Sequence, residues 1–108
     1  MQTISRDELK SKMDRNGDLA IVDVLSPEQY KEGHLPGAIN VPVGEQFKHS
    51  IQQAVPDKGQ AVVLYCANKE CSASPKAAQQ MDELGYERVY DYEAGKADWK
   101  NAGLPLTQ

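Results

Sequence analysis

The sequence predicts an α/β domain in which a mostly parallel sheet is covered by helices on both faces. Residues 19–24 and 61–65 are almost wholly apolar, as strands buried on both sides are. Helix-start signals follow both runs, and strands alternate with helices along the chain, which is typical of parallel sheets. The length of 108 residues suits one core. We therefore expect a single domain over residues 1–108.

The first helix is expected from about residue 6 to residue 13. Ser5 and Glu8 have the spacing of a capping box, in which each side chain accepts a hydrogen bond from the other residue's backbone N–H. The Asn-Gly-Asp sequence at residues 16–18 breaks this helix before the first buried strand.

The second helix repeats the start signal. Ser26 is the expected cap, Pro27 the first helical residue and Gln29 the reciprocal partner of the cap. Gly33 ends this short helix, and after a loop we expect a short strand at residues 38–41.

The middle of the chain contains the clearest strand. Phe47, Ile51 and Val55 lie four residues apart, which predicts one face of a helix, and residues 56–59 form a turn. The strand at residues 61–65 follows directly.

The last third of the chain continues the alternation. Pro75 is expected at a first helical position, with Ser72 or Ser74 as the cap. A short strand at residues 88–91 and a final helix at residues 97–102 complete the elements.

The overall charge argues against two classes of partner. The chain has 12 Lys and Arg against 16 Asp and Glu, a net charge of -4, whereas binding of nucleic acid or an anionic membrane needs clustered cations. No apolar run approaches the roughly 18 residues of a membrane span, and the first five residues do not resemble a signal peptide. The expected location is cytoplasmic.

The two cysteines lie close together at a chemically favourable place. Cys66 directly follows the strongest strand and precedes a helix start, and reactive groups of open α/β sheets gather at such strand ends. Loop amides and the helix dipole would favour the Cys66 thiolate and would also form a cradle for an anion. We expect a nucleophile with a lowered pKa.

Other interpretations of the two cysteines remain open. Cys66 could be a small buried apolar residue, as free cysteines often are. A zinc site with His34 or His49 is disfavoured because the spacing to Cys71 is C-x-x-x-x-C and no second ligand pair exists, so no metal is expected. A Cys66–Cys71 disulfide is sterically feasible if the Cα atoms come within about 7 Å.

Several segments, in a fixed order, carry a resemblance to a known family. They are residues 21–24, 27–30 and 33–42, then 62–66, 72–73, 77–78 and 84–86, and finally Gly95, Trp99 and 102–105. With these segments the chain resembles the single-domain rhodaneses, a family of sulfurtransferases.

The resemblance implies a three-layer α/β/α fold with a five-stranded parallel sheet and a catalytic thiolate at Cys66. In that family the thiolate takes a sulfane sulfur from thiosulfate, a persulfide or a polysulfide and passes it to a thiol or cyanide acceptor, with no metal or organic cofactor. A protein thiol or persulfide carrier is a further expected partner. The residues expected to hold the persulfide are Ala67, Asn68, Lys69, Glu70, Cys71 and Ser72.

The chain departs from the family pattern at four positions. Lys69 stands where the family usually has Gly, and Cys71 and Leu25 stand where it usually has Arg. Ala94 replaces the first of two late glycines. Without the loop Arg, a doubly charged oxyanion loses a rigid partner, so we expect thiosulfate to be a poorer donor than a persulfide or polysulfide.

Three residues have proposed supporting roles. Cys71 could attack the inner sulfur of a Cys66 persulfide, releasing sulfide and forming a disulfide, or could hold the outer sulfur in transit; alternatively it only packs. Asp23 is expected to accept from loop amides rather than to act as a base. His34 is expected to fix its loop through hydrogen bonds.

Two other functions are weighed against the sulfurtransferase. A phosphatase or arsenate reductase is disfavoured by the short loop without Arg, because phosphoryl transfer needs three charged oxygens clamped. A non-catalytic binding or redox-sensing module, in which Cys66 and Cys71 switch between dithiol and disulfide, stays open.

Overall fold

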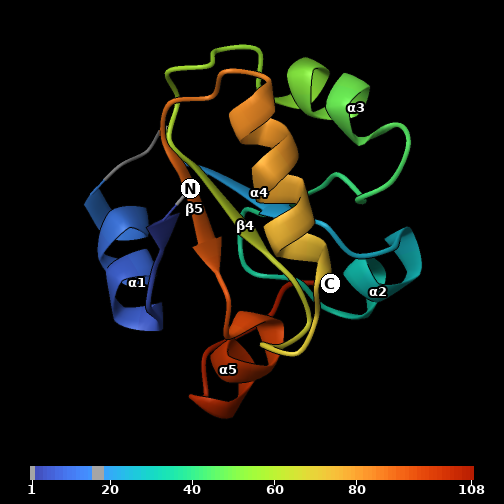
Figure 1. The fold of residues 1–108 in the computed structure, drawn as a ribbon. Helices are drawn as coiled ribbons and strands as arrows, with labels where there is room; N and C mark the ends of the chain where they lie inside the picture. The colour runs from blue at the N-terminus through green and yellow to red at the C-terminus, as the bar shows by residue number, and fades with distance from the viewer. Residues whose placement is uncertain (1, 16–18) are drawn as a thin grey trace.

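The protein is built on a single five-stranded sheet (Figure 1). The computed structural model describes residues 2–15 and 19–108. All strand pairs in the sheet are parallel, and the strand order is β1-β5-β4-β2-β3. The strands are β1 (Gln2–Thr3), β2 (Ala20–Asp23), β3 (Ile39–Asn40), β4 (Val62–Tyr65) and β5 (Val89–Tyr92). This arrangement confirms the five-stranded parallel sheet.

Helices cover both faces of the sheet, which confirms the three-layer α/β/α fold. They are α1 (Arg6–Arg15), α2 (Pro27–Glu32), α3 (Phe47–Ala54), α4 (Ala73–Glu83) and α5 (Gly95–Asn101). The core residues of α3 and α4 form one cluster with Val62 and Leu64 of β4, whereas those of α1 and α5 pack with Val63 and Tyr65. Alternate residues of β4 therefore belong to opposite layers, as a strand buried on both faces requires.

The predicted capping signals form as hydrogen bonds. The N–H of Glu8 donates to the Ser5 hydroxyl at 3.2 Å, and the N–H of Ser5 donates to the Glu8 carboxylate at 3.1 Å. Ser26 accepts from the N–H of Gln29 at 3.3 Å, with Pro27 at the start of α2. Phe47 and Ile51 are both buried in α3, as the predicted helix face requires. The expected break at residues 16–18 lies outside the described residues.

Some predicted boundaries were wrong, most of all at α4. Helix α4 begins at Ala73, so Pro75 is its third residue, and Ser72 occupies the cap position without a side-chain hydrogen bond to the helix. Proline is tolerated there because the first four N–H groups of a helix have no partner within it. The candidate cap Ser74 is instead inside the helix and buried.

The remaining boundary differences are small. Helix α1 extends to Arg15, β3 has only two residues, β5 ends at Tyr92 and α5 begins at Gly95.

Strand β1 was not predicted. Its two residues, Gln2 and Thr3, are exposed and pair with Tyr90 and Asp91 of β5. A two-residue exposed strand shows neither an apolar run nor alternation, so the sequence contains no periodic signal for it.

Among residues 2–15 and 19–108, none of the helices combines the length and the hydropathy needed to cross a membrane.

Candidate active site

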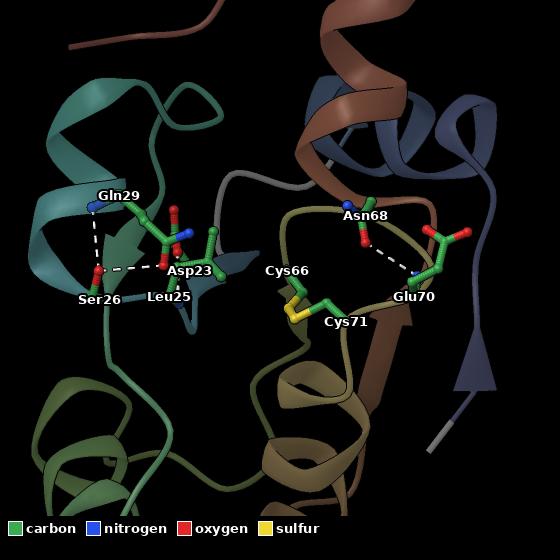
Figure 2. The surroundings of a disulfide bond; sticks show 8 residues. All are labelled: Asp23, Leu25, Ser26, Gln29, Cys66, Asn68, Glu70 and Cys71. Carbon is green, nitrogen blue, oxygen red and sulfur yellow. Dashed lines mark hydrogen bonds between the residues drawn. A yellow bond between two sulfur atoms is a disulfide. The ribbon is translucent and has the colours of Figure 1, made fainter.

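Cys66 lies immediately after β4, between the sheet and the start of α4 (Figure 2). Its side chain is 0% exposed and packs in the cluster formed with α3 and α4. Cys71 is partly exposed at the far end of the loop and is disulfide-bonded to Cys66, with a Cα–Cα distance of 6.2 Å. The spacing noted in the sequence therefore brings the two sulfur atoms together.

The loop between the cysteines is folded by its own hydrogen bonds. The Asn68 side chain accepts from the N–H of Glu70 at 3.1 Å (Figure 2), and the Asn68 carbonyl accepts from the N–H of Cys71 at 3.2 Å. The backbone N–H groups of Glu70 and Cys71, which are expected to hold a persulfide, therefore already donate hydrogen bonds within the loop in the disulfide form. Lys69, Glu70 and Ser72 are exposed around it.

Helix α5 holds the first part of the loop from the opposite layer. The N–H of Lys96 donates to the Cys66 carbonyl at 2.9 Å, and the N–H of Ala97 donates to the Ala67 carbonyl at 2.8 Å. In a planar trans peptide the C=O and the following N–H point in opposite directions. The N–H groups of Ala67 and Asn68 therefore point away from the N–H groups of α5 that bind these two carbonyls.

Gly95 permits this close approach. Its φ is +68°, in the left-handed region, and a Cβ atom at this position would lie 2.5 Å from the Cys66 carbonyl oxygen. Any side chain here would have to displace backbone rather than a flexible group.

Asp23 joins three segments around the carboxyl end of the sheet. Its carboxylate accepts from the N–H of Leu25 at 2.8 Å (Figure 2) and from the Tyr65 hydroxyl at 2.9 Å. The same hydroxyl accepts from the N–H of Leu35 at 3.1 Å. Burial raises the pKa of Asp23, and these donors offset part of the effect. Accepting a loop amide is the role that the sequence predicts for Asp23, whereas the contribution of Tyr65 was missed.

His34 is held within its loop. Its Nδ1 lies 2.9 Å from the Tyr30 carbonyl oxygen, and the two rings stack with centroids 3.8 Å apart. Its backbone exchanges two hydrogen bonds with Thr107. These contacts agree with the expectation that His34 fixes its loop.

Two features of the site were not found from the sequence. A cavity of about 320 Å³ adjoins the cysteine loop and is lined by Lys96, Lys100 and Glu32. The only sequence signal for it is the i, i+4 spacing of the two lysines, which places them on one side of a helix.

The second feature is Asp91, which is 0% exposed in β5. Among the described residues, neither of its carboxylate oxygens has a hydrogen-bond partner of normal geometry. Burial raises the pKa of Asp91, and the nearby Ser74 hydroxyl offsets only part of that effect.

Within residues 2–15 and 19–108, no three His, Cys, Asp or Glu side chains are grouped so that they could hold a metal ion.

Known proteins are similar to this chain in both sequence and fold. The transcriptional regulator Rv0324 of Mycobacterium tuberculosis is 33% identical over 97% of this chain and 44% of its own length. The thiosulfate sulfurtransferase PspE of Escherichia coli is 44% identical over 63% of this chain and 62% of its own length. The chain thus spans about half the length of the curated relatives it matches.

The solved structures agree with this similarity. The Alr3790 protein of Anabaena has a TM-score of 0.85 at 26% identity, over 96% of this chain and 81% of that one. The family model described as the rhodanese-like domain matches residues 5–102. The chain therefore belongs to the rhodanese-like domain family, and its relatives include sulfurtransferases.

Proposed function

We propose that this chain, as one rhodanese-like domain over residues 1–108, is a sulfurtransferase that carries a sulfane sulfur as a persulfide on Cys66. The observation that supports this most strongly is the position of Cys66. It follows β4 directly, its carbonyl is fixed by the backbone N–H of Lys96 in α5, and the N–H groups of Ala67 and Asn68 point away from α5 and are left to donate to a bound sulfur. Such donors stabilise a negatively charged sulfur as an oxyanion hole stabilises an oxygen.

The first half-reaction is a nucleophilic displacement. The Cys66 thiolate attacks the outer sulfur of a persulfide R–S–S⁻, the S–S bond of the donor breaks, and R–S⁻ leaves. Cys66 is then a persulfide, Cys66–S–S⁻. A thiol or cyanide acceptor takes the outer sulfur and returns the Cys66 thiolate. A protein thiol or persulfide carrier fits the same step, and no metal or organic cofactor takes part.

Cys71 offers a second exit for the sulfur. In this step the Cys71 thiolate attacks the inner sulfur of the protonated persulfide, Cys66–S–SH, so that the Cys66–Cys71 disulfide forms and HS⁻ leaves with the persulfide proton. The Cα–Cα distance of 6.2 Å lies in the range over which disulfides form. An external thiol then reduces the disulfide to complete the cycle. The proposed role of Cys71 is therefore that of a resolving thiol.

The preferred donor is a persulfide or polysulfide rather than thiosulfate. Leu25, where related proteins usually have Arg, is buried in the apolar cluster, and Cys71 replaces the loop Arg. Lys69 is exposed, and Glu70 follows it with the opposite charge. No guanidinium fork remains on the loop to bind a doubly charged oxyanion.

A redox-sensing module is the second candidate function. The Cys66–Cys71 disulfide favours it, because a dithiol–disulfide pair is a switch without any sulfur transfer. One relative is a transcriptional regulator, of which this chain covers less than half.

The donor preference tests the sulfurtransferase proposal. Reduced protein is supplied with cyanide and either thiosulfate or glutathione persulfide, and thiocyanate is measured after subtraction of the uncatalysed reaction. We expect kcat/KM to be roughly tenfold or more higher with the persulfide, since a charge-assisted bidentate pair is missing for thiosulfate. The Cys66→Ser variant should show neither reaction. Equal use of both donors would contradict the account of the lost Arg, and activity in Cys66→Ser would contradict the proposal itself.

A further inference from the structure

The cavity beside the cysteine loop has a charge pattern that the sulfur chemistry on Cys66 does not itself require. It lies between the end of α2, the loop and α5, and its wall includes Ala67 and Asn68, the two residues that follow Cys66. Lys96, Lys100 and Glu32 are among the residues that line it, so two cationic residues and one anionic residue border the cavity. The remaining wall, at Leu106 and Ala97, is apolar. A volume of about 320 Å³ is at the small end of ligand sites.

Lys96 is fixed in place relative to the nucleophile. Its backbone N–H donates to the Cys66 carbonyl at 2.9 Å, and its ammonium group donates to the Gln29 carbonyl of α2 at 3.0 Å. An ammonium group has three donors, so two remain for a ligand. The side chain is half-buried, which reduces the entropy lost when it binds an anion.

The combination of two cations with one anion selects a particular ligand class. A carboxylate can pair with Lys96 and Lys100 while an ammonium group of the same molecule pairs with Glu32. A small dianion such as thiosulfate would fill little of the cavity and would be repelled by Glu32. An amino acid or short peptide with free charged ends satisfies all three side chains, and its apolar part can contact Leu106.

We propose that this cavity binds an amino-acid or short-peptide thiol, or its persulfide, with Lys96 and Lys100 holding a carboxylate and Glu32 holding the ammonium group. The role of the bound ligand rests on the proposed function, in which this sulfur compound is the donor or acceptor for Cys66. The binding site itself is independent of that chemistry. Since the cavity touches the loop at Ala67, a ligand held by the lysines lies alongside the residues that follow the nucleophile.

The binding test uses S-methylglutathione, whose sulfur cannot react, and the reduced 108-residue chain. Calorimetric titration should give a Kd that rises roughly fivefold in Lys100→Met, since one partly screened ion pair is lost. Lys100 is exposed on α5, so this change leaves the Lys96 contact with α2 in place. Lys10→Met removes the same charge from α1, on an exposed position away from the cavity, and should bind within about twofold of the unchanged protein.

The kinetic arm separates this inference from the proposed function. With glutathione persulfide, Lys100→Met should raise KM roughly fivefold, whereas its kcat/KM with inorganic polysulfide should stay within about twofold of the unchanged protein. Absence of S-methylglutathione binding, or equal binding by Lys100→Met and Lys10→Met, would overturn the inference even if Cys66 transfers sulfur. Binding that depends on Lys100 in a chain that transfers no sulfur would support the site and reject only the sulfurtransferase.

Discussion

At the scale of single residues, the environment of each cysteine decides which sulfur atom reacts. Cys66 is fully buried in the disulfide form, whereas Cys71 is partly exposed. Thiol–disulfide exchange requires access to the attacked sulfur. In the proposed cycle an incoming thiol therefore attacks Cys71, and Cys66 leaves as the thiolate. Under the proposed function, this exchange regenerates Cys66 in the thiolate form that attacks a sulfane donor.

The Cys71→Ser variant tests the resolving role. Without the second thiol, a Cys66 persulfide loaded from glutathione persulfide cannot form the internal disulfide, so release of sulfide in the absence of an acceptor should slow roughly tenfold or more. Sulfide is measured over time in the variant and in the unchanged protein. An equal rate in the two would contradict this role and would leave Cys71 as a packing residue.

The sequence predicts the site at this scale because the key residues are neighbours along the chain. Cys66 and Cys71 are recognised from a strand, a loop and a helix start that follow one another. The hydrogen bond from the Tyr65 hydroxyl to Asp23 joins residues 42 positions apart, and no local pattern indicates it. Such contacts depend on the register between β2 and β4, which places Asp23 opposite Tyr65.

At the scale of elements, helix α5 stabilises the loop that joins Cys66 to Cys71. Two backbone hydrogen bonds from its first turn reach the carbonyls of Cys66 and Ala67. They form only because Gly95 has no side chain and adopts a positive φ. The start of α5 at Gly95, two residues earlier than predicted, follows from these contacts between distant segments rather than from a capping signal in the sequence.

The Gly95→Ala variant tests this connection between α5 and the loop. We expect a loss of about 1–3 kcal/mol in the free energy of unfolding, measured with denaturant, together with slower persulfide formation on Cys66. Gly103→Ala is the matched control, because its φ is +79° but a Cβ atom there meets nothing within 4 Å. Equal losses in the two variants would mean that the positive φ alone, and not the contact with Cys66, sets the cost.

Local signals account for most elements, but not for all. The capping pair Ser5 and Glu8 and the apolar run of β4 are short-range features, and both form as predicted. Strand β1 consists of two exposed residues that are ordered by pairing with β5. The start of α4 before Pro75 likewise depends on the loop that the helix must follow, so propensity alone gave the wrong first residue.

At the scale of the whole molecule, Asp91 makes stability depend on pH. The carboxyl is buried, and burial raises its pKa above the ordinary value of 3.8. The negative charge of Glu93 also raises the pKa of Asp91. Between the ordinary and the raised pKa, the folded protein binds more protons at Asp91 than the unfolded chain does. Its contribution to stability is therefore fully present below pH 3.8 and is lost as pH rises through the folded-state pKa. Asp23 acts in the same direction.

The Asp91→Asn variant removes this titration. We expect it to be more stable than the unchanged protein at pH 7 by about 1–3 kcal/mol, because no charge is left buried without a partner, and the difference should shrink as pH falls toward 4. Denaturant unfolding at several pH values measures it. Asp14→Asn, at an exposed position on α1, should stay within about 0.5 kcal/mol throughout. A destabilised Asp91→Asn at pH 7 would contradict the argument.

The intact mass of the protein tests the persulfide on Cys66 most directly. The chain is reduced, exposed briefly to glutathione persulfide and weighed by mass spectrometry, with Cys71→Ser as the background so that the adduct cannot convert to the internal disulfide. The account predicts a gain of one sulfur atom in Cys71→Ser and no gain when Cys66→Ser is added. The account is contradicted if Cys71→Ser gains no mass, or if a gain persists after Cys66 is also replaced. If the unchanged chain only loses two hydrogens and Cys71→Ser forms no adduct, the pair is a redox switch.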